Sequence, residues 1–137
     1  MEYMAVPRLI SLAERAWARQ PDWATVEDAV ERDRQRQRAW AEFANRLGQQ
    51  ELPRLTGIDP AWTYRLPVPG AVIEDGQLRA NTALPGLTVR YTTDGSAPTA
   101  QSTPYAGPVS VRGAEVVKLR TFDAQGRGSR VATLRAK

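Results

Sequence analysis

The stretch Leu87-Thr88-Val89-Arg90-Tyr91-Thr92-Thr93 decides the fold of the C-terminal half of this chain. Apolar and polar side chains alternate along it, which is the pattern of a β-strand with one buried and one solvent-facing side. Asp94-Gly95-Ser96 follows directly and is a turn signal, because Gly accepts a positive φ and an Asp carboxylate can bond its own backbone. We expect a strand that ends in a tight turn, with Tyr91 facing the core.

Further short stretches with strand character lie on both sides of this one. Turn residues separate them, and the stretches are Ala71–Ile73, Gln77–Ala80, Val109–Val111, Val117–Thr121 and Ser129–Arg135. About six or seven short strands at this spacing predict an antiparallel immunoglobulin-like β-sandwich.

The N-terminal part has a helical pattern instead. A first helix is expected from about Val6 to Arg19, with Pro7 at its first position, where a missing N–H costs nothing. Its apolar face consists of residues at steps of three and four: Leu9, Leu12, Ala13, Ala16 and Trp17.

A second helix is expected to begin at a capping box made by Thr25 and Asp28, and to stop at Gly48. Acids, Arg and Gln alternate over residues 31–38 in its middle, which favours a solvated face with local ion pairs. A short third helical segment, Gln49–Leu55, is interrupted by Pro53.

The sequence therefore predicts an α+β chain in three parts. A short helical segment with two or three helices occupies residues 1–59. A Pro-rich junction covers residues 60–70, and the antiparallel immunoglobulin-like β-sandwich covers residues 71–137.

The composition excludes several kinds of site. The 137 residues include no Cys and no His, which removes disulfides, thiolate metal sites, the commonest zinc ligand and any Ser-His-Asp triad. No apolar run is close to a length of about 18 residues, which would suggest a membrane span. We expect no metal, no cofactor and no membrane span.

The charge is unevenly placed. The formal net charge is +4, and most of the basic excess lies in the C-terminal half. Its Arg residues come singly at strand spacing, so they are interpreted as solvent-facing positions, and no nucleic-acid partner is expected.

Two motifs carry a resemblance to a known family. Residues 4–17, Met-Ala-Val-Pro-Arg-Leu-Ile-Ser-Leu-Ala-Glu-Arg-Ala-Trp, resemble the closing helix of the catalytic barrel in glycoside hydrolase family 20, the bacterial chitobiases and β-N-acetylhexosaminidases. Residues 89–99, Val-Arg-Tyr-Thr-Thr-Asp-Gly-Ser-Ala-Pro-Thr, followed by Tyr105, resemble the hallmark of the C-terminal domain that follows that barrel. Residues 65–70, Arg-Leu-Pro-Val-Pro-Gly, resemble the junction between the two.

The resemblance implies an enzyme that removes terminal N-acetylhexosamine residues by substrate-assisted catalysis, with a Glu as general acid and the preceding Asp orienting the acetamido group. In that family the pair follows two glycines, and no Gly-Gly-Asp-Glu occurs here. The pairs Glu27-Asp28 and Glu74-Asp75 have the reverse order and lie at an expected helix start and an expected turn. We expect no catalytic residue in this chain, which is interpreted as the C-terminal part of such an enzyme, cut just after its active-site residues end.

An alternative is a carbohydrate-binding module that holds chitin-like substrate near the active site of the parent enzyme. Its candidate sugar contacts are Trp62, Tyr105 and Asp94. Each also has a structural interpretation, because buried aromatic rings are common and Asp-Gly is itself a turn signal. Trp17, Trp23 and Trp40 are interpreted as core or interface residues.

The expected partner is the remainder of the parent catalytic barrel, with N-acetylglucosamine-containing glycans as the partner in the alternative. The apolar face of the first helix is expected to pack on the second helix and the sandwich, or to mediate a dimer, because a wet apolar patch is unfavourable. A periplasmic or secreted location is implied by the resemblance alone.

Overall fold

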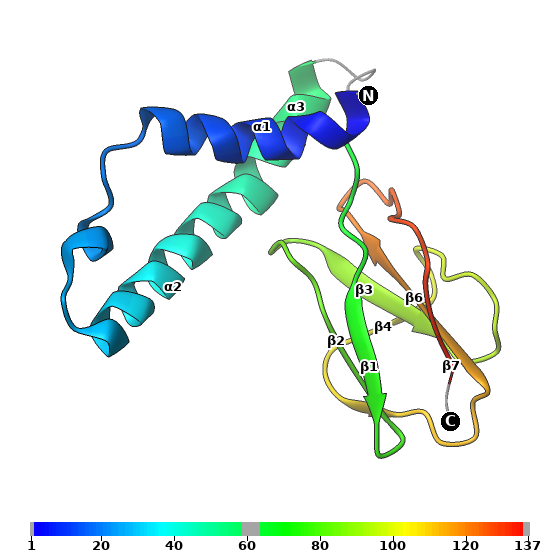
Figure 1. The fold of residues 1–137 in the computed structure, drawn as a ribbon. Helices are drawn as coiled ribbons and strands as arrows, with labels where there is room; N and C mark the ends of the chain where they lie inside the picture. The colour runs from blue at the N-terminus through cyan, green and yellow to red at the C-terminus, as the bar shows by residue number, and fades with distance from the viewer. Residues whose placement is uncertain (1, 59–63, 136–137) are drawn as a thin grey trace. The chain divides into compact units, whose positions relative to one another are not determined.

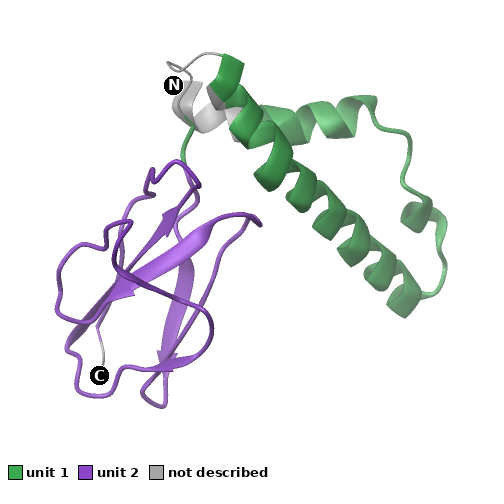
Figure 2. Cartoon of the chain, turned by 180° about the vertical axis from the view of Figure 1, so that it is seen from behind, with its two compact units in different colours: residues 1–65 green, residues 66–137 purple. Residues whose placement is uncertain are grey.

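The computed structural model describes the backbone of residues 2–58 and 64–135, and side chains from Leu9 onward except for residue 56. The chain forms two compact units, residues 1–65 and residues 66–137 (Figure 2). The division between the two units lies inside residues 60–70, the stretch that the sequence suggests as a junction. The boundaries of the three predicted parts stay a prediction. None of the described helices is long and apolar enough to cross a membrane.

The first unit is helical (Figure 1). Its elements in chain order are α1 (Glu2–Trp17), the short 3₁₀ helix η1 (Asp22–Thr25), α2 (Ala29–Arg46), the π-helical turn η2 (Leu47–Glu51) and α3 (Leu52–Ile58).

Two predicted helix starts are wrong. Helix α1 begins at Glu2, so Pro7 lies inside the helix and not at its first position. Helix α2 is capped by Asp28, whose carboxylate accepts from the Glu31 N–H at 2.7 Å. The hydroxyl of Thr25 instead donates to the carbonyl of Asp22 at 3.0 Å, so it closes η1 and gives α2 no cap.

The predicted stop at Gly48 is also wrong, because the helix widens there and continues. The N–H of Leu52 donates to the carbonyl of Leu47, a five-residue step that defines a π-turn. Both leucines are buried, at 4% and 2% exposure. The wide turn keeps these two leucines on one side, and their burial favours continuing the helix over ending it at the glycine.

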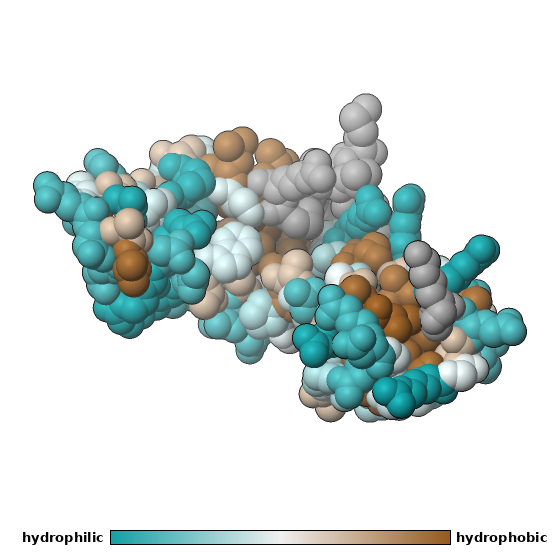
Figure 3. All heavy atoms as spheres, turned by 60° about the horizontal axis from the view of Figure 1, so that its bottom comes forward, coloured by the Kyte–Doolittle hydropathy of each residue, from teal (hydrophilic) through white to brown (hydrophobic). Residues whose placement is uncertain are grey.

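The middle of α2 carries the ion pairs expected from its charge pattern. Arg34 contacts Glu31 at 2.6 Å and Arg36 contacts Asp33 at 2.5 Å, each three residues apart and largely exposed. Figure 3 shows mainly hydrophilic side chains over the end of the helical unit where α2 begins. Such exposed pairs contribute little to stability, because solvent screens the attraction and holding two long side chains in place costs entropy.

The helical unit leaves much apolar surface open. The exposed large apolar side chains of α1 are those of Leu9, Leu12 and Trp17, at 55%, 64% and 84%. The expected packing of this face on the second helix is therefore wrong for these three residues, whereas the expected dimer stays a prediction. A face of this kind is typical of a surface that another polypeptide covers.

The second unit is an antiparallel β-sandwich, as the strand pattern predicts. One sheet has the order β1 (Gly70–Glu74), β2 (Gln77–Asn81), β5 (Val109–Ser110). The other has the order β4 (Thr103–Pro104), β3 (Thr88–Thr92), β6 (Val116–Phe122), β7 (Ala132–Arg135). The named strands pair antiparallel throughout, and Tyr91 of β3 lies opposite Leu119 of β6.

Both sheets contribute to one apolar core. Its buried members are Leu78, Val89, Val111, Val117 and Leu119, and Tyr91 packs against them as the alternation of β3 predicts. The sandwich therefore has the continuous core that the described part of the helical unit lacks.

Candidate functional site

The turn after β3 holds Asp94 in a structural role. One carboxylate oxygen accepts from both the N–H of Ser96, at 2.9 Å, and its hydroxyl, at 2.6 Å. Gly95 has a φ of 78°, the left-handed conformation that the Asp-Gly turn requires. The hydroxyl of Ser96 holds the pKa of Asp94 below its ordinary value of 3.8, and the backbone N–H of Ser96 adds to the effect. The expected turn is confirmed.

Tyr105 is half-buried against the sandwich core. Its phenolic oxygen accepts from the N–H of Ala80 at 2.9 Å, and its own N–H donates to the carbonyl of Val89 at 2.8 Å. The ring therefore connects β2 to the segment after β4.

The third candidate, Trp62, lies outside the described residues. Within the described part of the chain no hydrogen bond joins Asp94 to Tyr105. Tyr105 bonds to Ala80 and Asp94 bonds to Ser96, and sugar contact by the three candidate residues stays a prediction.

The acidic pairs have local roles. Asp28 caps α2, and Glu74 faces Arg79 at 3.8 Å across the β1–β2 hairpin. Asp75 and Gly76 form that hairpin turn with φ of 52° and 73°. Over the residues that the structure describes, no group of three or more acids gathers as a metal ion would require.

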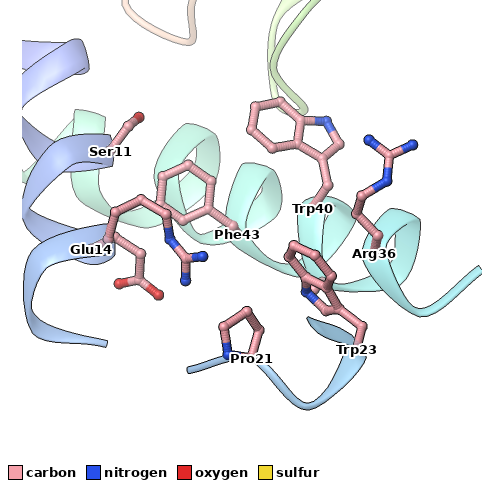
Figure 4. A pocket seen from close by; sticks show the side chains of 9 residues that line it. Ser11, Glu14, Pro21, Trp23, Arg36, Trp40 and Phe43 are labelled. Carbon is pink, nitrogen blue, oxygen red and sulfur yellow. The ribbon is translucent and has the colours of Figure 1, made fainter. Parts of the chain in front are cut away.

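Described side chains of the helical unit line two hollows that the sequence pattern did not indicate. One, called here the aromatic cleft, has a volume of about 320 Å³ and is lined by side chains from α1, the η1 segment and α2. Its charged and aromatic side chains are Glu14, Arg15, Trp23, Arg36, Trp40 and Phe43, and Figure 4 shows the lining side chains as sticks. The spacing of Trp23 and Trp40 predicted only that they lie in a core or an interface, because periodicity shows which face a ring is on and not whether a neighbour covers it.

The other hollow is a long apolar groove of about 950 Å³ between α1 and the α2–α3 segment. Trp17, Phe43, Leu47 and Ile58 line it, with charged side chains such as Arg46 at its edges.

Comparison with known proteins gives the chain its family. Residues 51–131 match the family described as "Chitobiase/beta-hexosaminidase C-terminal domain". The chain belongs to this family. The matched stretch begins in η2 and ends just before β7, so the family domain includes α3 as well as the first six strands.

Two bacterial proteins show the same relationship. The chain is 44% identical over 106 residues to N,N'-diacetylchitobiase of Vibrio harveyi, covering 69% of this chain and 11% of that protein. It is 35% identical over 113 residues to a beta-hexosaminidase of Vibrio vulnificus, covering 69% of this chain and 13% of that protein. The chain thus spans only about a tenth of the length of these relatives.

Proposed function

We propose that this chain is a non-catalytic C-terminal part of a β-N-acetylhexosaminidase of the chitobiase kind, and that its sandwich supports the catalytic barrel. The observation that carries the proposal is the family match, which falls on a small share of two much longer glycosidases. The roles of the described acids agree with it. Asp28 and Asp94 are used to cap a helix and to close a turn.

The α1 face supports a docking role. Leu12 and Trp17 are more than half exposed, and burying such side chains is worth about 25 cal/mol per Å² of apolar area. We infer that the rest of the enzyme covers this face. The carbohydrate-binding alternative gains no such support, because the three aromatic rings of the described sandwich, Tyr91, Tyr105 and Phe122, are buried or packed against its core.

The absence of catalysis is tested directly. The purified chain is assayed for release of an aryl leaving group from an N-acetylglucosaminide, and no release above the buffer blank is expected. Measurable turnover that follows the protein through a second purification step would overturn the non-catalytic assignment.

The supporting role is tested in a chimera. The matching segment of the Vibrio harveyi relative is replaced by this chain, and the chimera is compared with a version that lacks the segment. We expect the chimera to melt at a higher temperature than the shortened protein. Trp17→Glu should reduce that gain, whereas Arg34→Gln, a change on the solvated face of α2, should not. Equal melting of the chimera and the shortened protein would contradict the proposal.

A further inference from the structure

The aromatic cleft has an apolar wall that solvent can reach. The rings of Trp40 and Phe43 have centroids 5.9 Å apart and planes inclined at 42°. Trp40 is 57% exposed, so most of its ring is free to make contacts, and Trp23 is half-buried beside it. Exposed indole rings in a hollow are favourable sites for a ligand that has an apolar face.

The inclination of the rings limits the shape of that ligand. The rings of Trp40 and Phe43 are inclined to each other, so they do not form a parallel-walled slot for a flat ligand. The exposed face of Trp40 can instead accept the apolar face of a non-planar ring. The volume of about 320 Å³ is near the lower end for ligand sites, so the cleft suits one such ring and not an extended molecule.

The polar groups around the wall limit its chemistry. Figure 4 shows Glu14 across the opening from the two Trp side chains. Glu14 and Arg15 form no side-chain hydrogen bond or ion pair with the described residues, so the cleft offers one carboxylate and one guanidinium. The third charged side chain, Arg36, is already paired with Asp33 at 2.5 Å.

These charges nearly balance, which favours a neutral ligand over an anion or a cation. A carboxylate accepts from hydroxyl groups and a guanidinium donates to them, so the pair matches a ring edge that carries several hydroxyls. The geometry points to a binding site for a single neutral hexopyranose unit, with an apolar face of the sugar ring on Trp40 and its hydroxyls toward Glu14 and Arg15. This site lies in the helical unit and does not depend on the proposed supporting role of the sandwich.

The indole N–H signals of the intact chain provide a direct test. The four Trp residues give four resonances in a proton–nitrogen spectrum, and each is assigned by a single Trp→Phe variant. The chain is titrated with methyl β-glucoside and with N-acetylglucosamine, and with glycerol as a non-cyclic polyol. We expect saturable shifts at Trp23 and Trp40 with either sugar, a Kd on the order of 1 mM, and no shift with glycerol.

Matched variants show whether the cleft is responsible. Trp40→Ala should weaken binding about tenfold, which is what loss of a stacked aromatic contact costs. Trp17→Ala removes a more exposed ring outside the cleft and should leave the Kd unchanged, and far-UV circular dichroism checks that both variants keep their helices.

Three results would overturn the assignment. Flat titrations with both sugars would mean that the cleft binds no single hexopyranose unit. Shifts confined to Trp62 would place any sugar contact at the junction. Equal binding by Trp40→Ala would remove the stacking on which the proposal rests. None of these results would bear on the chimera test of the supporting role.

Discussion

The N–H of Ala80 donates to the phenolic oxygen of Tyr105 at 2.9 Å, and this bond completes the pairing of β2 on one side. Strand β5 pairs only with Gln77 and Leu78, so it ends before Ala80. The tyrosine hydroxyl takes the position that a longer β5 would fill, because a half-buried backbone N–H is costly to leave without a partner. Tyr105 is thus part of the sandwich framework.

Tyr105→Phe should therefore lower the stability of the sandwich. The variant keeps the ring but leaves the Ala80 N–H without its acceptor, which costs about 1–2 kcal/mol. Tyr91→Phe is the matched control, because the Tyr91 ring packs against the core while its hydroxyl bonds to no described residue. Urea unfolding monitored by amide signals of the sandwich gives both values. Equal stability of the two variants would show that the bond to Ala80 contributes nothing.

Asp94 should make the stability of the sandwich depend on pH. Its pKa is lowered below 3.8 in the folded state by the hydroxyl and N–H of Ser96, so the folded state favours the charged form. The resulting stabilisation is fully present above the unfolded pKa and is lost as the pH falls through the folded pKa. Asp94→Asn should thus be less stable than wild type at neutral pH, and the difference should shrink as the pH falls below 3.8 and through the lowered pKa of Asp94.

Ser96→Ala provides a second measurement of the same contact. Removing its hydroxyl takes away the largest cause of the shift, so the pKa of Asp94 should move up toward 3.8. The carboxyl carbon signal of Asp94 is followed through an acid titration in both proteins. An unchanged titration curve would contradict the assigned cause.

Asp28 should determine where α2 begins. Asp28→Ala removes the acceptor for the Glu31 N–H and should cost about 1 kcal/mol, the usual value of an N-cap, with a loss of helical ellipticity. Thr25→Ala is the informative control, since its hydroxyl bonds to Asp22 and not to α2. Urea unfolding followed by helical ellipticity compares the two variants. A larger loss of stability in Thr25→Ala than in Asp28→Ala would support the capping box that the sequence suggests.

The sequence predicted the sandwich well because its signals are local. Alternation along β3 places Tyr91 inward by geometry alone, and Gly95 marks the turn because a positive φ costs it nothing. The motif shared with the glycosidase family falls on these same residues. The role of Tyr105 was not predictable, because its hydroxyl bonds to a residue 25 positions away.

The helix ends were predicted less well because two residues compete for each role. Thr25 and Asp28 both have capping side chains, and the choice falls on Asp28 because the Thr25 hydroxyl already bonds to Asp22 within η1. Gly48 is a usual stop, but burial of Leu47 and Leu52 favours continuing through it as a π-turn. The aromatic cleft is formed by three elements that are separate in sequence, so no single periodicity could indicate it.

The two units should respond differently to truncation of an apolar side chain. Leu119 is fully buried in the sandwich core, so Leu119→Ala should cost about 2–5 kcal/mol through lost contacts and a cavity. Leu12 is 64% exposed on α1, so Leu12→Ala should change the stability of the isolated chain by less than about 0.5 kcal/mol. Amide hydrogen exchange in β6 and in α1 measures each unit separately. In the chimera with the Vibrio harveyi relative, Leu12→Ala should lower the melting temperature, because the rest of the enzyme would then cover the apolar face of α1. An unchanged melting temperature of that chimera would mean that α1 docks through other residues.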